Sequence, residues 1–429
     1  MPRSAPARRP YRPRRAAVAA LLLAAALTGP TLPNATAGER PSPGTHGGGG
    51  SERELRRALA ELVAAPGGPP GAIAVLTRDG VRRVYHAGTA DLGTGTDTGT
   101  RARTGTADGR PPRAHDHMRI ASVAKAFSGA VALGLVDRGA LDLDDTLGER
   151  LPQLPEEWHA VTLRQLLQHT SGLPDYSQSE RFQAIVRADP RHRFVSRRLL
   201  EFAYGEDLAF PPGSRYAYSN SDNIAVALMA EQATGRRYED LLRELVYRPL
   251  DLRDTSLPSG FRLPRPFLHG YATAPGEEPE DVSEAISASG AWASGGIVST
   301  PADLSTFIGG YAGPTLLSPR TRHAQRRFVP GDSQPAGPGV NAAGLGLFRY
   351  TTRCGTVLGH TGNTPGYTQF AAATPDGRRT VTVSVTSQVT LDPALLARLR
   401  ATEERFVCAL LEGGHDGQEP HGGYGDPTA

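Results

Sequence analysis

Strand-forming segments lie near both ends of this chain, and a long helical stretch separates them. Residues 71–88 form two strand-like runs around Asp79-Gly80, a typical hairpin turn. Residues 367–387 form a second hairpin, whereas the pattern from about 126 to 290 is mostly helical. We therefore expect an α+β fold, in which an antiparallel sheet flanked by helices is built from both ends of the chain and carries an inserted, mostly helical subdomain. A functional site would then lie in the cleft between the two parts.

The two ends of the chain predict segments outside this fold. Residues 1–37 have the pattern of a signal peptide, with a basic start, an apolar run too short to span a bilayer and an Ala-Thr-Ala cleavage pattern. Residues 38–51 are expected to be a linker, 52–412 the folded domain and 413–429 a disordered tail. We therefore expect a secreted, extracellular protein with no stable membrane anchor.

The net charge changes when the signal peptide is set aside. The whole chain has a formal charge of +3, and residues 1–37 contain six arginines and no acidic residue, so the remainder has a charge of −3. The basic character belongs to the export segment. Composition therefore gives no reason to expect nucleic acid as a partner.

The chain contains two cysteines, Cys354 and Cys408. In an exported protein such a pair is expected to form a disulfide, here closing a loop of about 54 residues. Two free, buried thiols are the alternative.

The stretch RIASVAKAF, residues 119–127, contains Lys125, the only lysine among 47 basic side chains. An arginine stays protonated in proteins, whereas a lysine can be tuned to lose its proton. Ser122 precedes Lys125 by three positions, so the two share one face of a helix that begins here. Burial and the helix N-terminus both favour a neutral amine at Lys125 and an activated Ser122. A chance lysine in an arginine-biased chain is the alternative.

The tripeptide Tyr218-Ser219-Asn220 follows a Pro/Gly turn and precedes an apolar helix. Tyr218 could relay protons if a nearby cation lowers its pKa, and Asn220 could bind a substrate amide. Taken alone, a tyrosine in a loop is more often a packing residue.

The tripeptide His360-Thr361-Gly362 lies just before or within a strand. Glycine permits a ligand to approach the backbone, and the exposed N–H groups of a strand edge can supply part of an oxyanion hole. Taken alone, the tripeptide is more often an ordinary glycine-rich turn.

Together, S-x-x-K, Y-S-N and H-T-G in this order resemble the serine penicillin-recognising superfamily, in its branch of class C β-lactamases and D-alanyl-D-alanine carboxypeptidases. The segments MRIASVAKAF, LRQLLQHTSGLPDY (163–176) and ASGGIVSTPADLSTF (293–307) also look like that family. The resemblance covers roughly residues 52–412 and implies the β-lactamase/transpeptidase-like fold. The overlapping Ser221-Asp222-Asn223 is not taken as the second motif, because its context matches the tyrosine branch.

The resemblance also implies catalytic roles. Ser122 would be the acylated nucleophile, and Lys125 and Tyr218 would activate it and move its proton, with either as the main base. Asn220 would contact the acyl-side amide. The backbone N–H groups of Ser122 and Asn363 would form the oxyanion hole.

A carboxylate-binding side is implied as well. His360, Thr361 and Gly362 would help bind the terminal carboxylate of the substrate, supported by Arg349 or, as the weaker choice, Arg353. Trp292 would line the acyl pocket or belong to the core.

Other residues are expected to be structural, and no cofactor is expected. His115-Asp116-His117 is consecutive and has no further ligands nearby, so we expect no metal there. His169 is interpreted as a turn residue rather than a catalytic one.

The favoured activity is therefore an exported, penicillin-binding serine D-alanyl-D-alanine carboxypeptidase. Its partners would be peptidoglycan stem peptides or other small acyl substrates, and β-lactams would inhibit it covalently. A class C-like β-lactamase is one alternative, and an esterase or D-amino-acid amidase on the same scaffold is another. A homologue without catalytic activity is a further one, although the presence of all three motifs speaks against it.

Overall fold

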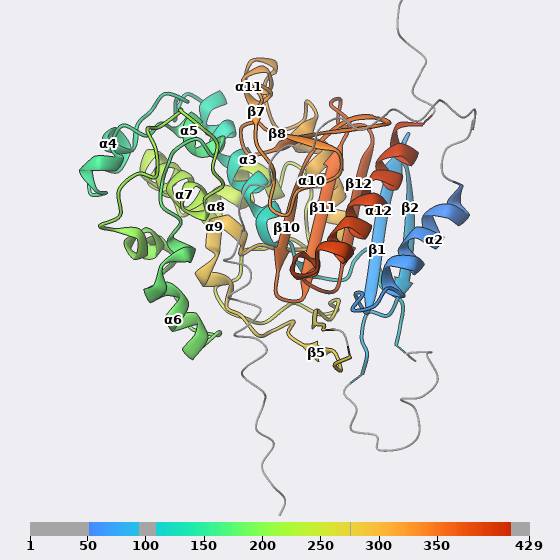
Figure 1. Cartoon of the computed structure of the whole chain (residues 1–429). Coiled ribbons are helices and arrows are strands. Elements are labelled where there is room, and N and C mark those ends of the chain that lie inside the picture. The colour runs from blue at the N-terminus through green and yellow to red at the C-terminus, as the bar shows by residue number, and fades with distance from the viewer. Residues whose placement is uncertain (1–50, 94–108, 275, 413–429) are drawn as a thin grey trace, which may run out of the picture.

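A computed structural model describes residues 51–93, 109–274 and 276–412 of the chain. Its centre is an eight-stranded sheet in the order β2-β1-β12-β11-β10-β9-β8-β7, with every neighbouring pair antiparallel (Figure 1). The strands are β1 (Gly71–Arg78), β2 (Val81–Gly88), β7 (Val329–Pro330), β8 (Val340–Ala343), β9 (Phe348–Thr352), β10 (Gly355–Thr364), β11 (Tyr367–Ala373) and β12 (Thr380–Val385). The predicted α+β fold is confirmed.

The two ends of the chain meet in this sheet where β1 pairs with β12. Ala72 lies opposite Val385 in that pair. The hairpin predicted at Asp79-Gly80 forms, and both residues have the positive φ angles, 53° and 77°, that a tight type I′ turn requires. Strands β7 to β9 lacked a clear pattern in the sequence and extend the sheet beyond the predicted hairpins.

Alternate residues of the strands face two separate apolar cores. One face packs against α2 (Glu52–Val63) and α12 (Pro393–Leu411), and the other against α3 (Ala124–Asp137) and α10 (Pro301–Ala312). Thus Val357 belongs to the first core and its neighbour Leu358 to the second.

The helices of the middle of the chain gather beside the sheet (Figure 1). They are α4 (Leu147–Arg150), α5 (Leu163–Leu167), α6 (Glu180–Ala188), α7 (Asn220–Thr234), α8 (Tyr238–Leu242) and α9 (Trp292–Gly295), with α11 (Pro319–Gln325) further along the chain. Short 3₁₀ turns lie at η1 (Ala121–Val123), η2 (Glu156–Trp158), η3 (Tyr176–Gln178), η4 (Ser196–Ala203), η6 (Ala288–Gly290) and η7 (Val389–Leu391), and η5 (Arg243–Tyr247) is a π-helical turn. Two small ladders pair β3 (Met118–Arg119) with β6 (Val298–Ser299), and β4 (Tyr271–Ala272) with β5 (Glu280–Asp281).

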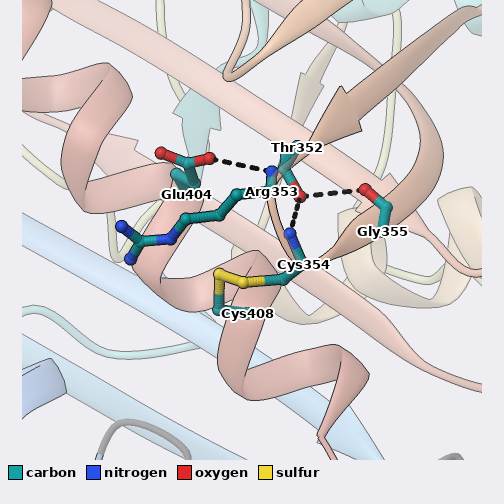
Figure 2. Close-up of a disulfide and its surroundings, with 6 residues drawn as sticks. All are labelled: Thr352, Arg353, Cys354, Gly355, Glu404 and Cys408. Carbon is teal, nitrogen blue, oxygen red and sulfur yellow. Dashed lines mark hydrogen bonds between the residues drawn. A yellow bond between two sulfur atoms is a disulfide. The ribbon is translucent and has the colours of Figure 1, made fainter. Parts of the chain in front are cut away.

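A disulfide ties the sheet to the last helix. Cys354, in the turn between β9 and β10, is bonded to Cys408 of α12 (Figure 2). The turn is fixed further by the Cys354 N–H, which donates to Thr352 Oγ1 at 3.2 Å, and by the Arg353 N–H, which donates to Glu404 at 3.2 Å. These contacts hold the start of β10 against α12.

The predicted signal peptide, most of the predicted linker and the predicted tail lie outside the described residues. Within the described part of the chain, no helix is both long and apolar enough to cross a membrane.

Candidate active site

Ser122 lies in the 3₁₀ turn η1, directly before α3 begins at Ala124. Strand β10 passes close behind it, so that a Cβ atom added at Gly362 would lie 2.7 Å from the Ser122 backbone nitrogen. A glycine is therefore required at 362 for this approach. The structure thus brings the first and third sequence motifs into contact.

Lys125 is completely buried and faces Ser122. Its Nζ donates to Ser122 Oγ at 3.0 Å, to Asn220 Oδ1 at 2.8 Å and to the Ser294 carbonyl at 2.7 Å. Burial disfavours the charged ammonium and lowers the pKa of Lys125 from 10.5 to about 7, although Asp175 and Asp222 oppose the shift. Lys125 therefore exists largely as a neutral amine slightly above pH 7, within reach of the Ser122 proton.

Tyr218 lies beside the same amine, with Lys125 Nζ 4.9 Å from the centre of its ring. Its hydroxyl is buried and has no hydrogen bond of ordinary geometry among the described residues. Burial raises the pKa of Tyr218 above its usual value, although the nearby Ser122 opposes this. The sequence-based condition for a proton relay, a pKa lowered by a nearby cation, is not met, because the loss of water around Tyr218 dominates the shift. Burial thus keeps the Tyr218 hydroxyl protonated, whereas it favours loss of the Lys125 proton.

Asn220 begins helix α7 and is held from both sides. Its Oδ1 accepts from Lys125, while its Nδ2 donates to Asp175 Oδ2 at 2.9 Å and to Ser177 Oγ at 3.2 Å. The side chain lines the cavity described below. Without substrate, the Asn220 side chain orients Lys125 through the hydrogen bond from Nζ, a role that the sequence did not indicate.

The buried pair of His169 and Asp222 packs next to Tyr218. His169 Nδ1 lies 2.7 Å from Asp222 Oδ2, and the rings of His169 and Tyr218 face each other with centroids 4.5 Å apart. The His169 carbonyl also accepts from the Ala217 N–H at 2.9 Å, and the His169 backbone has a positive φ of 57°. Burial lowers the pKa of His169 to about 3 and raises that of Asp222. His169 is a turn residue, as expected, and in addition it packs directly against the motif tyrosine.

The predicted carboxylate-binding residues do not reach the cavity. His360 is buried, with Nδ1 2.6 Å from the Thr361 carbonyl, and burial lowers the pKa of His360 to about 3. Thr361 is buried too, and its hydroxyl donates to the Pro335 carbonyl at 2.5 Å. Arg349 lies exposed on β9, stacked 4.8 Å above the Phe328 ring. His360, Thr361 and Arg349 thus do not line the cavity, and their part in binding a carboxylate stays a prediction.

Trp292 belongs to the core rather than to the acyl pocket. It is 2% exposed, its Nε1 donates to Glu239 at 3.2 Å, and its ring packs edge-to-face against Tyr238. Its neighbour Ala291 lines the cavity instead.

Asn363 follows Gly362 on β10 and does line the cavity. Its side-chain oxygen accepts from Gln388 Nε2 at 2.7 Å and from Thr390 at 3.3 Å. These contacts fix the strand end whose N–H is the predicted second donor of the oxyanion hole.

A cavity of about 200 Å³ opens at Ser122. Its polar end comprises Ser122, Tyr218, Asn220 and Asn363, and its other end lies beneath α6. The α6 side could not be predicted from a motif, because its lining residues, Phe182, Gln183, Val186 and Arg187, form no recognisable pattern. Asp175 and Ser294 were also missed, although Asp175 lies within the LPDY segment that resembles the family. Among the described residues, no group of three His, Cys, Asp or Glu side chains could hold a metal ion.

Comparison with known proteins agrees with this geometry. A family model described as Beta-lactamase matches residues 55–404. Penicillin-binding protein 4* of Bacillus subtilis (strain 168) is 24% identical over 288 residues, which cover 63% of this chain and 61% of that protein. The D-aminopeptidase of Cereibacter sphaeroides is 33% identical over 216 residues, which cover 50% of this chain and 37% of that protein.

A solved structure is similar over almost its whole length. The D-stereospecific amidohydrolase from Streptomyces sp. has a TM-score of 0.66 and 27% identity, with 81% of this chain and 97% of that chain covered. The chain thus matches this structure nearly end to end, whereas it spans less than two thirds of the two curated relatives.

Proposed function

The chain belongs to the beta-lactamase family of serine hydrolases, and from this premise we propose that it is a D-stereospecific amidohydrolase that works through an acyl-enzyme on Ser122. One observation carries the proposal. Lys125 Nζ lies 3.0 Å from Ser122 Oγ, and burial lowers the pKa of this lysine to about 7. A serine nucleophile beside an amine that is neutral near physiological pH is the arrangement that acyl transfer needs.

The reaction proceeds through the residues already described. Lys125 takes the Ser122 proton while Oγ bonds to the substrate carbonyl carbon, and the N–H groups of Ser122 and Asn363 stabilise the resulting oxyanion. When the tetrahedral intermediate collapses, the C–N bond breaks and the leaving amine takes a proton, which Tyr218 passes on from Lys125. Water then attacks the ester carbonyl and gives its proton to Lys125. The ester C–O bond breaks, Lys125 returns the proton to Ser122 Oγ, and the acid product leaves.

An amide substrate is favoured over a free terminal carboxylate. The residues expected to bind that carboxylate, His360 and Arg349, do not line the cavity, and His360 is neutral because burial lowers its pKa to about 3. The similarity to a D-stereospecific amidohydrolase over 97% of its chain supports the D-configuration.

A D-alanyl-D-alanine carboxypeptidase is the second candidate. The S-x-x-K, Y-S-N and H-T-G order and the similarity to penicillin-binding protein 4* favour it. In that case penicillin would form a stable adduct on Ser122, whereas a β-lactamase would release the hydrolysed drug quickly.

The test compares a D-substrate with its L-enantiomer, and an anilide with a peptide that ends in a free carboxylate. N-acetyl-D-alanine p-nitroanilide, its L-enantiomer and a peptide ending in D-Ala-D-Ala are incubated with the protein and with Ser122→Ala, and mass spectrometry follows penicillin adducts in parallel. We expect hydrolysis of the D-anilide, at least about 10-fold slower hydrolysis of the L-anilide, and no turnover by Ser122→Ala. Equal rates on both enantiomers would overturn the D-specificity. Release of D-alanine that is faster than anilide hydrolysis would favour the carboxypeptidase.

Export is proposed as well, on the basis of the pattern in residues 1–37. Expression of the whole chain in an actinobacterial or other secreting host, followed by N-terminal sequencing of protein from the medium, tests it. Cleavage before Gly38 is expected, and retention of the intact chain inside the cells would contradict the proposal.

A further inference from the structure

The cavity at Ser122 has an apolar end to which helix α6, at the outer edge of the helical half (Figure 1), contributes Phe182 and Val186. The apolar residues there are Tyr176, Phe182, Val186, Pro190, Phe194 and Ile286. No residue of α6 is fully buried, so Phe182 and Val186 keep part of their surface open. Apolar surface left facing water favours an apolar occupant by about 25 cal/mol for each Å² that it covers.

This apolar end is built as a continuous wall that reaches the catalytic residues. The Phe182 ring stacks on Phe194 with centroids 4.8 Å apart and meets Tyr176 edge-on at 5.2 Å. Tyr176 donates to the Gly290 carbonyl at 2.8 Å and lies 3.3 Å from Ser294 Oγ. The Ser294 carbonyl also accepts from Lys125. Ser294 therefore contacts both the aromatic wall and the reactive amine.

The charges around the cavity argue against a positively charged occupant. Among the described lining residues, Arg187 is the one with a charged side chain, and it lies exposed on α6, where it donates to Gln183 at 3.4 Å. The nearest carboxylate behind Asn220, Asp175, already accepts from the backbone and side chain of both Ser177 and Asn220. No carboxylate of the described residues lines the cavity, so a free ammonium in the apolar end would lose its water without gaining an anionic partner.

We propose that this apolar end of the cavity binds an apolar side chain in the acyl half of the substrate. The protein would then prefer aromatic or branched D-residues whose own nitrogen is in amide linkage. This inference rests on the proposed amidohydrolase function and names its substrate class. The position of the wall beside Asn220 and Ser177 assigns it to the acyl side, because Asn220 is the residue expected to contact the acyl-side amide.

The experiment compares three chromogenic anilides with the same leaving group: N-acetyl-D-phenylalanine, N-acetyl-D-alanine and unblocked D-phenylalanine p-nitroanilide. We expect kcat/KM for the acetylated D-phenylalanine substrate to exceed both others by at least about 10-fold, since filling an apolar pocket discriminates by about 10- to 200-fold. Equal or better hydrolysis of the D-alanine compound would overturn this inference and leave the amidohydrolase function intact. Hydrolysis of none of the three would refute the proposed function itself.

Two variants of α6 locate the effect. Val186→Trp fills the cavity and is expected to lower kcat/KM for acetylated D-phenylalanine at least about 10-fold, with a much smaller loss for acetylated D-alanine. Ala184→Trp introduces the same side chain on the same helix at an exposed position that does not line the cavity, and should leave both values unchanged. Equal losses on both substrates in Val186→Trp, or a selective loss in Ala184→Trp, would contradict a side-chain pocket at α6.

Discussion

Two buried ionisable side chains lie on opposite faces of the same sheet, and their surroundings differ sharply. Lys125 belongs to α3 on the cleft side, and Glu403 belongs to α12 on the other side. Burial lowers the pKa of Lys125 to about 7 and raises the pKa of Glu403 to about 8. One physical cause, the loss of water around a charge, thus makes an amine neutral and keeps a carboxyl protonated.

The geometry around the two groups separates function from packing. Lys125 has three hydrogen-bond acceptors in reach, one of which is the hydroxyl of Ser122 at the floor of a cavity. Glu403 lies on α12, where the charge of Arg400 opposes the rise of its pKa, and it does not line that cavity. A displaced pKa therefore identifies a catalytic group only when a nucleophile and a space for substrate accompany it.

The largest expected effect comes from replacing Lys125, on the cleft side of the sheet. Lys125→Arg keeps a positive charge that cannot be given up, so kcat/KM should fall at least about 10²–10⁴-fold. Lys125→Met, which is neutral but cannot accept a proton, should fall as far and controls for misfolding caused by the larger guanidinium. Activity is measured together with circular dichroism. Near-full turnover by the arginine variant would refute the role of Lys125 as a base.

The second prediction concerns the disulfide on the other face of the sheet. Removing the disulfide with Cys354→Ser and Cys408→Ser should lower the free energy of unfolding by about 4 kcal/mol, because the bond closes a loop with a sequence separation of 54 residues. Urea unfolding of the double variant gives the value, and reduced wild-type protein serves as its control. The folded variant should keep most of its kcat/KM, since the bond lies between α12 and the β9–β10 turn. A loss of activity as large as that of Lys125→Arg would show that the two faces are coupled.

The third prediction concerns the pH at which the cleft becomes active. If Lys125 is the base, as proposed, kcat/KM should rise with pH through about 7. Asp175 raises the pKa of Lys125 against the effect of burial, so Asp175→Asn should move this rise to lower pH. The pH profile of kcat/KM for wild type and variant measures the shift. A rise that moves to higher pH, or does not move, would contradict this account of the lysine.

The smallest expected effect compares the two groups through stability. For Glu403 the folded-state pKa is about 8 and the ordinary value 4.5, so the folded state binds the extra proton between these pH values and stability falls as pH rises through that window. For Lys125 the folded-state pKa is about 7 and the ordinary value 10.5, so its contribution to stability rises with pH between them.

Glu403→Gln should remove the first dependence. The variant should gain stability relative to wild type as pH rises from about 4.5 to 8, by no more than about 1.4 kcal/mol per pH unit. Chemical unfolding at pH 5 and pH 8 measures the gain. Glu404→Gln is the matched control, because Glu404 lies next in sequence on α12 and is only partly buried. A gain that is larger at pH 5 would contradict a buried, protonated Glu403.

Much of the site was predictable because it lies in short motifs. Ser122 and Lys125 are one helical turn apart, so their contact follows from the local geometry of the chain, and the single lysine among 47 basic residues marked the position. The sheet built from both ends followed from two hairpins with clear turn residues. The disulfide followed from a pair of cysteines behind an export pattern.

The direction of a side chain could not be predicted from the motifs. The resemblance implied that His360, Thr361 and Arg349 bind substrate, and the structure leaves all three outside the cavity lining, because the direction of a strand side chain depends on register and on neighbours far away in sequence. Trp292 was ambiguous because the same aromatic residue suits a core and a pocket.

The sequence by itself determined the order of the three motifs, the contact between Ser122 and Lys125, and the meeting of the two chain ends in one sheet. These depend on local spacing and on apolar periodicity, which are properties of the sequence itself. The tertiary structure alone decided that Asn220 orients the lysine, that His169 packs beneath Tyr218, and that α6 forms an apolar wall beside Ser122. Those facts arise from contacts between segments tens of residues apart, and only the folded packing fixes how far water is excluded around each charge.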